Sequence, residues 1–133
     1  MAGRTRPRRG EAGATLLETA LTMPALLLLT LGLVQVALWA HALNVAGDAA
    51  SFGAREAATA QGNLRVAVAT TQDLLQSGLG AYAAGFTVQG QDSGPSIVFD
   101  VQGSIPLLLP WLGTAALPVH AERVARKEVR YAP

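Results

Sequence analysis

Glu18 is the residue of this sequence whose chemistry most needs an explanation. It lies at the front edge of a long apolar segment, and the stretch from Thr19 to Ala40 that follows it contains no charged side chain. An ionised carboxylate that is buried without a partner costs several kcal/mol. Either the segment is not a membrane helix, or the charge of Glu18 has a role of its own.

Other residue types that catalyse reactions do not form a recognisable site. The chain has no cysteine and two histidines, His41 and His120, and two imidazoles make a poor zinc site. The sequence contains no nucleophile elbow, phosphate-binding glycine loop or paired acid motif. We therefore expect a protein that is not an enzyme, has no catalytic residues and needs no metal, cofactor or small-molecule substrate.

Composition and charge indicate a membrane rather than a nucleic acid as the environment. The 133 residues suit one modest domain, and with 50 % hydrophobic and 14 % charged residues the chain is poor in charge. The net charge of +1 conceals two basic clusters, one at each end of the chain: Arg4, Arg6, Arg8 and Arg9, and Arg123, Arg126, Lys127 and Arg130. Neither cluster has the aromatic platforms of a nucleic-acid site, so the first predicts a cytoplasmic flank.

The apolar segment itself predicts a transmembrane helix. About twenty apolar residues at 1.5 Å rise each span the roughly 30 Å hydrocarbon core. Basic residues before the segment orient the N-terminus to the cytoplasm, so that the chain beyond His41 is exported. Trp39 lies near the outer end, where an indole suits the headgroup boundary. Pro24 lacks an amide donor and is expected to kink the helix one turn earlier, around Ala20.

Three fates are open to such an N-terminal segment. It is an uncleaved signal anchor, a secretory signal cut after Ala42 in the sequence Ala40-His41-Ala42 to release a soluble binding module, or a prepilin-type segment. The apolar stretch is longer than the usual apolar region of a secretory signal, about 7–15 residues. The helical pattern also continues through the Ala42 site, with no glycine or proline between that site and Gly47. A plain anchor gives Glu18 no role.

An ordered set of features between residues 13 and 58 resembles a known family. Gly13 is followed by Glu18 and then by Pro24, a polar and aromatic stretch at residues 35–41, and the step Ala54-Arg55-Glu56. This combination resembles the TadE-like family, small pseudopilins or minor pilins of the tight-adherence (Tad, Flp-type or type IVc) pilus assembly system. It covers about a third of the chain. One departure is Thr19, where Flp-type sites usually carry an aromatic residue, which bears on the efficiency of processing.

The resemblance implies a mechanism and a set of partners. A membrane prepilin peptidase cuts between Gly13 and Ala14 at the cytoplasmic face and leaves the helix in the membrane. The new ammonium of Ala14 then neutralises Glu18, in the same or a neighbouring subunit, so that Glu18 acts in recognition and assembly. The implied partners are the peptidase, other pilins or pseudopilins, the Tad-type assembly platform and membrane lipid, in adhesion or secretion.

The resemblance and the apolar segment together predict three parts of the chain. Residues 1–13 form a basic leader, residues 14–43 the transmembrane helix, and residues 44–133 an exported α+β domain. The protein is then single-pass in the bacterial inner membrane, with a cytoplasmic N-terminus. Whether the mature protein stays in the membrane or enters the pilus filament is open.

The exported part begins with helical sequence. Between residues 41 and 61, four small residues share one face of a helix: Ala46, Ala50, Gly53 and Ala57. This face either packs against another subunit or packs on the protein's own sheet. Asn63 is the expected cap of a second helix that ends at the glycines Gly78, Gly80 and Gly85. The apolar face of this helix contains Leu64, Val68, Leu75 and Leu79.

The last third of the chain has the alternation of strands. Phe86 and Val88, and then Ile97, Phe99 and Val101, alternate with polar residues on either side of turn residues 91–95, which predicts a β-hairpin. A further strand is expected at residues 117–124. The predicted fold is therefore α+β and pilin-like, with a long helix, a shorter helix and a small antiparallel sheet. The apolar, proline-containing loop at residues 105–113 either covers the core or touches lipid or a partner.

Overall fold

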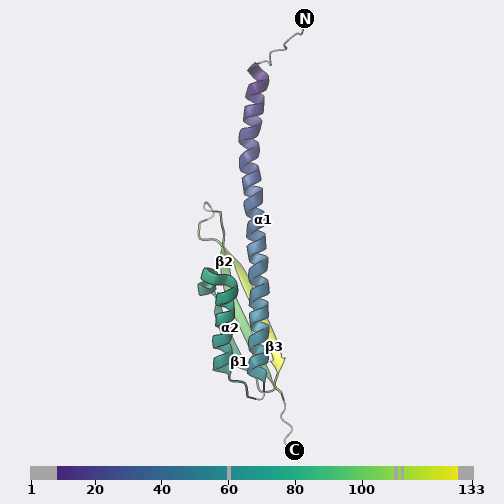
Figure 1. Cartoon of the computed structure of the whole chain (residues 1–133), viewed down its shortest axis with the longest axis vertical. Coiled ribbons are helices and arrows are strands. Elements are labelled where there is room, and N and C mark those ends of the chain that lie inside the picture. Colours follow the sequence, from purple (N-terminus) through teal and green to yellow (C-terminus); the bar gives the residue numbers. More distant parts are fainter. Residues whose placement is uncertain (1–8, 60, 110, 112, 129–133) are drawn as a thin grey trace, which may run out of the picture. The chain divides into compact units, whose positions relative to one another are not determined.

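The computed structural model describes residues 9–59, 61–109, 111 and 113–128. The elements run in the order α1 (Arg9–Ala58), α2 (Leu64–Leu79), the 3-10 helix η1 (Gly80–Gly85), β1 (Thr87–Asp92), β2 (Ser96–Pro106) and β3 (Ala116–Arg126) (Figure 1). This is the α+β fold that the sequence predicts. The chain divides into two compact units, Met1–Val34 and Gln35–Pro133, and each is described by itself.

The sheet of the second unit is antiparallel, with strand order β1-β2-β3. Val101 of the central strand pairs with Val88 on β1 and with Ala121 on β3. Alternate side chains of β2 are buried, as the sequence predicts, and Phe99 and Val101 are fully buried. The hairpin turn is shorter than predicted, because Gln91 and Asp92 continue β1.

The connection between β1 and β2 consists of residues 93–95. Asp92 Oδ1 accepts a hydrogen bond of 2.9 Å from the Gly94 amide, and Gly94 has a φ of 83°. A side chain at such a φ is strained, whereas glycine is not. The hydrogen bond to Asp92 and the positive φ of Gly94 therefore stabilise a connection of three residues.

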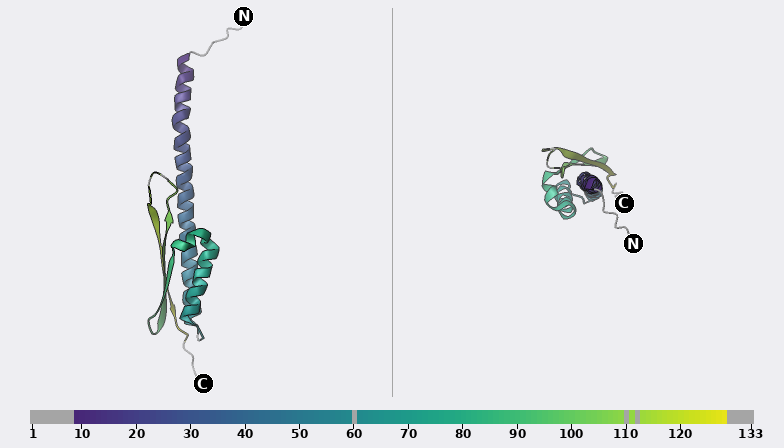
Figure 2. Two further views of the ribbon diagram at one scale, coloured as in Figure 1. Left: turned by 90° about the vertical axis from the view of Figure 1, so that its left-hand side faces the viewer. Right: turned by 90° about the horizontal axis from the view of Figure 1, so that it is seen from above.

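The part of α1 beyond Gln35 and α2 cover the same face of the sheet (Figure 2). Ala46 and Ala50 are fully buried. A Cβ on Gly53 would lie 2.6 Å from Phe99 Cε1 and would also overlap the hydroxyl of Thr71. Of the two interpretations of the small-residue face, packing on the protein's own sheet is therefore the one the structure shows.

Helix α2 begins and ends close to where the sequence predicts. The Asn63 side chain accepts hydrogen bonds from the amides of Arg65 and Val66, at 2.9 and 3.4 Å, as an N-cap does. Its buried face combines Ala67, Thr71, Leu75 and Leu79. Gly78, expected at the end of the helix, lies inside it, and the helix stops before Gly80, which has a φ of 57°.

Strand β3 is slightly longer than the predicted range of residues 117–124 and pairs with β2 along its whole length. Ile105, expected in the apolar loop, belongs to β2 and is 2 % exposed. It therefore contributes to the core, whereas Pro110 and Leu112 of the same predicted loop lie outside the described residues.

Candidate functional site

The first unit presents an apolar helix surface without a protein core around it. Leu31 is half-buried, and the unit's other described large hydrophobic side chains are exposed: Leu16, Leu17, Leu21, Met23, Leu26, Leu27, Leu28, Leu29, Leu33 and Val34. Helix α1 is long and apolar enough to cross a membrane, and only 6 % of its most apolar 18-residue stretch is buried. A core helix of a soluble protein would be mostly buried, so this segment indicates membrane anchoring.

The polar side chains of this segment are mostly satisfied within the helix. The hydroxyls of Thr15, Thr19, Thr22 and Thr30 each donate to the carbonyl four residues earlier, at 2.9, 2.9, 2.6 and 2.8 Å. A threonine bonded in this way exposes no unsatisfied donor to hydrocarbon. These hydrogen bonds were not predicted, although the position of the threonines within helical sequence was a signal for them.

Glu18 differs from these threonines. Its side chain is exposed, and within the described residues its carboxylate makes no hydrogen bond or ion pair. Ala14 lies four residues earlier in the same helix, and residues at this spacing lie on the same helix face. Ala14 and Glu18 therefore share one face of α1.

Gly13 and Ala14 lie inside α1, four and five residues after its first residue, Arg9. A Cβ added at Gly10 or Gly13 would meet no atom within 4 Å. Each glycine weakens a helix by roughly 0.5–1 kcal/mol relative to alanine, so the backbone around the predicted cleavage point opens more easily than its surroundings. The basic residues Arg4, Arg6 and Arg8 of the predicted leader lie outside the described residues.

Pro24 also lies inside α1, which continues on both sides of it. A proline in a helix removes one backbone hydrogen bond, the one its own amide would donate to the carbonyl of Ala20. The kink that the sequence predicts at this point remains a prediction.

Two side chains at the start of the second unit hold the helix to the sheet region, a role that was not predicted from the sequence. Gln35 is 6 % exposed; its Nε2 donates to the Pro106 carbonyl at 3.3 Å, and its Oε1 accepts from the Leu108 amide at 2.8 Å. Trp39, expected at the headgroup boundary, donates its indole N–H to the Pro118 carbonyl at 2.9 Å. The compact unit begins at Gln35, whereas the predicted membrane helix ends at residue 43.

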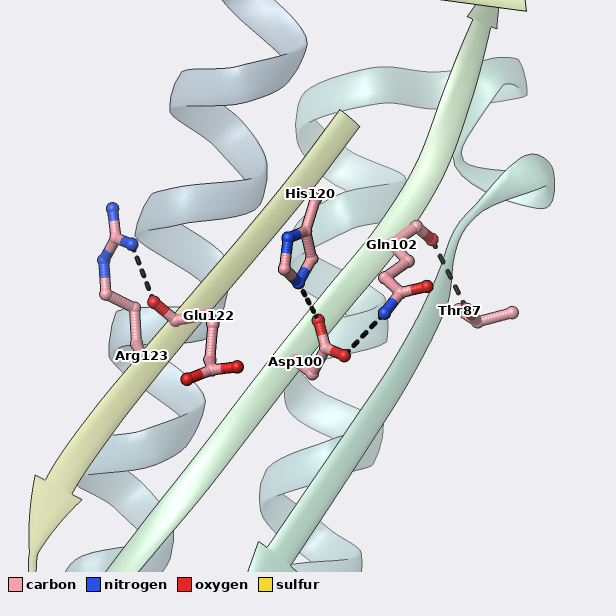
Figure 3. A network of polar contacts seen from close by, with 6 residues as sticks. All are labelled: Thr87, Asp100, Gln102, His120, Glu122 and Arg123. Atoms are coloured by element: carbon pink, nitrogen blue, oxygen red, sulfur yellow. Dashed lines mark hydrogen bonds and ion pairs between the residues drawn. The ribbon is translucent and has the colours of Figure 1, made fainter. Parts of the chain in front are cut away.

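A second polar cluster lies on the sheet face opposite the helices (Figure 3). Asp100 Oδ1 lies 2.7 Å from His120 Nε2, and Asp100 Oδ2 accepts from Gln102 Nε2 at 2.7 Å. The other histidine, His41, contacts the Gly78 carbonyl at 3.0 Å through Nε2. Within the described residues, no three His, Cys, Asp or Glu side chains form a group that could hold a metal ion. The cluster on the sheet joins neighbouring strands by cross-strand contacts.

Comparison with protein families finds a match over most of helix α1. Residues 13–55 match the model of a family described as TadE-like protein. The match begins at Gly13 and includes Glu18, Pro24 and most of the small-residue face, so it confirms the resemblance predicted from the sequence. No curated protein and no solved structure matches the chain significantly.

Proposed function

We propose, with the TadE-like match of residues 13–55 as the premise, that this chain is a minor pilin or pseudopilin of a Tad pilus assembly system. It is made as a precursor, cut by a prepilin peptidase between Gly13 and Ala14, and held in the bacterial inner membrane by its helix. It acts by binding other pilins and the assembly platform in building a pilus for adhesion or secretion, and it catalyses no reaction.

The observation that carries this proposal is the exposed Glu18 carboxylate, four residues after Ala14, among exposed apolar side chains. Cleavage after Gly13 creates an ammonium at Ala14 and makes Glu18 part of the first turns of the mature helix. A carboxylate is stabilised near a helix N-terminus and by a nearby ammonium. Because an unpaired carboxylate is costly in an apolar bundle, pairing with the ammonium of the same or a neighbouring subunit favours one register.

The length of the exposed segment fits this arrangement. A helix from Ala14 to Val34 extends about 31 Å at 1.5 Å per residue, close to the roughly 30 Å hydrocarbon core. The basic residues before it favour a cytoplasmic N-terminus. The peptidase then meets Gly13 at the cytoplasmic face, and the domain that begins at Gln35 is exported.

Release of a soluble module after Ala42 fits the packing less well. Ala42 is 0 % exposed and lies within α1. Cleavage after it would remove Gln35 and Trp39, whose side chains bond to the carbonyls of Pro106 and Pro118. A domain that retains these side chains keeps the hydrogen bonds to β2 and to β3, which favours a helix that stays attached.

Sequencing of the N-terminus of membrane-extracted protein tests the processing step. The proposal expects the sequence to begin Ala14-Thr15-Leu16. A start at Leu43 would establish the secretory interpretation, and an intact Met1 would establish an uncleaved anchor. Gly13→Ala should hinder cleavage, because the peptidase accepts little beyond hydrogen at this position. Gly10→Ala is the matched control, since it also replaces a helical glycine with open space around it and should be cut normally.

The assembly role of Glu18 is tested by Glu18→Gln. Membrane insertion should persist, because the segment becomes more apolar, and cleavage should persist at least in part. Co-purification of partner pilins at equal membrane levels should fall, because the Ala14 ammonium loses its partner at a cost of about 3 kcal/mol or more. Glu11→Gln is the control, since Glu11 is removed with the leader. Equal recovery with both variants would leave the carboxylate without an assembly role.

A further inference from the structure

The connection between β2 and β3 carries an unusual group of apolar side chains. We define the apolar loop by its described residues Leu107, Leu108, Leu109, Trp111 and Gly113; Pro110 and Leu112 lie outside the described residues. Trp111 is 64 % exposed, more than any other large hydrophobic side chain described from Gln35 onward. Leu107, Leu108 and Leu109 are half-buried, yet none of them packs against the hydrophobic core. The loop therefore does not serve mainly to cover the core.

The apolar loop is fixed to the first residue of the domain. Gln35 follows the exposed apolar segment directly, and its side-chain amide bonds to the Pro106 carbonyl and to the Leu108 amide. The Leu107 amide also donates to the Ala115 carbonyl at 3.1 Å, which closes the base of the loop. The loop is thus held within one side-chain length of the helix residue at which the domain begins.

The two ends of the sheet differ in charge. At the far end, Ala58 of α1 accepts a hydrogen bond from the Glu128 amide at 3.0 Å. The β1–β2 turn lies at that end, beside Lys127, which pairs with Asp92. The apolar loop lies at the opposite end of the strands (Figure 2). No Asp, Glu, Lys or Arg occurs between Asp100 and Glu122, so one end of the sheet is charged and the other is not.

We propose that the apolar loop inserts into the outer interface of the membrane that the helix crosses. This inference rests on the proposed membrane insertion of residues 14–34. A tryptophan and leucines without nearby charge suit the headgroup boundary, where an indole has one apolar and one hydrated side. Lipid is the occupant, because the loop is tied to the residue at which an inserted helix leaves the hydrocarbon. Trp111, rather than Trp39, is then the interfacial indole of the protein.

Site-specific fluorescence tests this placement in the full chain, which contains no cysteine. Trp111→Cys and Thr114→Cys place an environment-sensitive dye in or beside the apolar loop, and both replaced side chains are exposed. Ser93→Cys places the dye in the β1–β2 turn, and Leu27→Cys places it in the helix. Each labelled protein is reconstituted into phosphatidylethanolamine–phosphatidylglycerol vesicles that carry a spin label near the headgroup or deep in the acyl chain.

The expected result is emission at shorter wavelength for the loop dyes and loss of most of their intensity with the shallow spin label. The Ser93 position should show neither effect, and the Leu27 position should be quenched by the deep label. If Leu27 is quenched while both loop positions behave like Ser93, the loop lies in water and the inference is wrong, although the proposed function stands. If Leu27 is not quenched, the helix is not inserted, and the membrane part of the proposed function falls together with this inference.

Discussion

The two halves of helix α1 are both apolar but differ in side-chain size and in surroundings. Before Gln35, leucines dominate and are exposed; Leu27, for example, is 69 % exposed. After Gln35, alanines and Gly53 dominate and are buried; Ala50 is 0 % exposed. The large side chains offer area to lipid, whereas the small ones let the helix backbone approach the sheet and α2 closely.

Side-chain size, more than hydropathy, therefore distinguishes the exposed half of the helix from the half that packs on the sheet. The apolar run from Thr19 to Ala40 crosses the boundary between the two units without interruption by a charge. Gln35 is the only Asn or Gln in that run, and its buried amide is the first side chain of the domain to bond to the sheet region. One amide thus marks the point at which the helix surface changes from exposed and apolar to packed against the protein.

The largest effect is expected when a positive charge replaces an exposed apolar side chain in the first unit rather than in the second. Leu27 in the first unit and Val66 on α2 are 69 % and 55 % exposed. Leu27→Arg should cost about 2.5–3.5 kcal/mol of insertion free energy, because arginine is unfavourable near the centre of a membrane helix. Val66→Arg should cost almost nothing, since its side chain faces water. The measurement is the fraction of each variant that resists carbonate extraction from membranes. Equal fractions would show that the two positions do not differ in their surroundings.

The second test uses two glycines of the same helix. Gly53→Ala places a Cβ 2.6 Å from Phe99 Cε1, whereas Gly32→Ala meets no atom within 4 Å. We expect Gly53→Ala to lower the free energy of unfolding of the domain by about 1–3 kcal/mol through overpacking. Gly32→Ala should leave the domain unchanged. Urea unfolding of the detergent-solubilised protein, followed by protease susceptibility, measures both; an unaffected Gly53→Ala domain would mean that the helix is not packed closely on the sheet.

Local signals in the sequence predicted most of the elements. Asn63, the alternation around Phe99 and the glycine-containing turns each specify a short segment, and the structure has a cap, a buried strand and turns at those places. The inward role of Gln35 and Trp39 was not predicted, because their partners Pro106 and Pro118 lie more than seventy residues away in sequence. Hydropathy does not encode such contacts. The single amide in an apolar run was the available signal for Gln35.

The family resemblance was predicted from the sequence, whereas the roles of its individual residues stay predictions. Gly13 and Glu18 were identified by their spacing, and the family match includes both. The satisfied threonines around Glu18 were not predicted, although they explain how four hydroxyls fit in a helix with an apolar surface. The compact unit that begins at Gln35 depends on which side chains the sheet covers, a tertiary property that a run of apolar residues does not reveal. The predicted end of the membrane helix at residue 43 stays a prediction.

The smallest expected effect concerns a carboxylate in the domain that, unlike Glu18, has partners within the described residues. Asp92 Oδ2 lies 2.6 Å from Lys127 Nζ, and its Oδ1 accepts from the Gly94 amide. The hydrogen bond from Lys127, followed by that from Gly94, lowers the pKa of Asp92 below its usual 3.8. A carboxyl whose pKa is lower in the folded state stabilises the fold above the unfolded-state pKa, and this contribution disappears as the pH falls through the folded-state pKa.

The pH dependence of that pair therefore separates it from Glu18. The melting temperature of the domain should be slightly higher for the wild type than for Asp92→Asn at neutral pH. The difference should shrink as the pH falls below about 3.8 and vanish below the lower folded-state pKa of Asp92. Lys127→Met is the matched control and should remove most of the difference at neutral pH, since Lys127 is the main cause of the shift. The effect is small because the pair is exposed to solvent. A difference that persists unchanged at low pH would show that Asp92 holds the turn by shape rather than by charge, and Asp92 would then not contrast with Glu18 as a carboxylate stabilised by its charge.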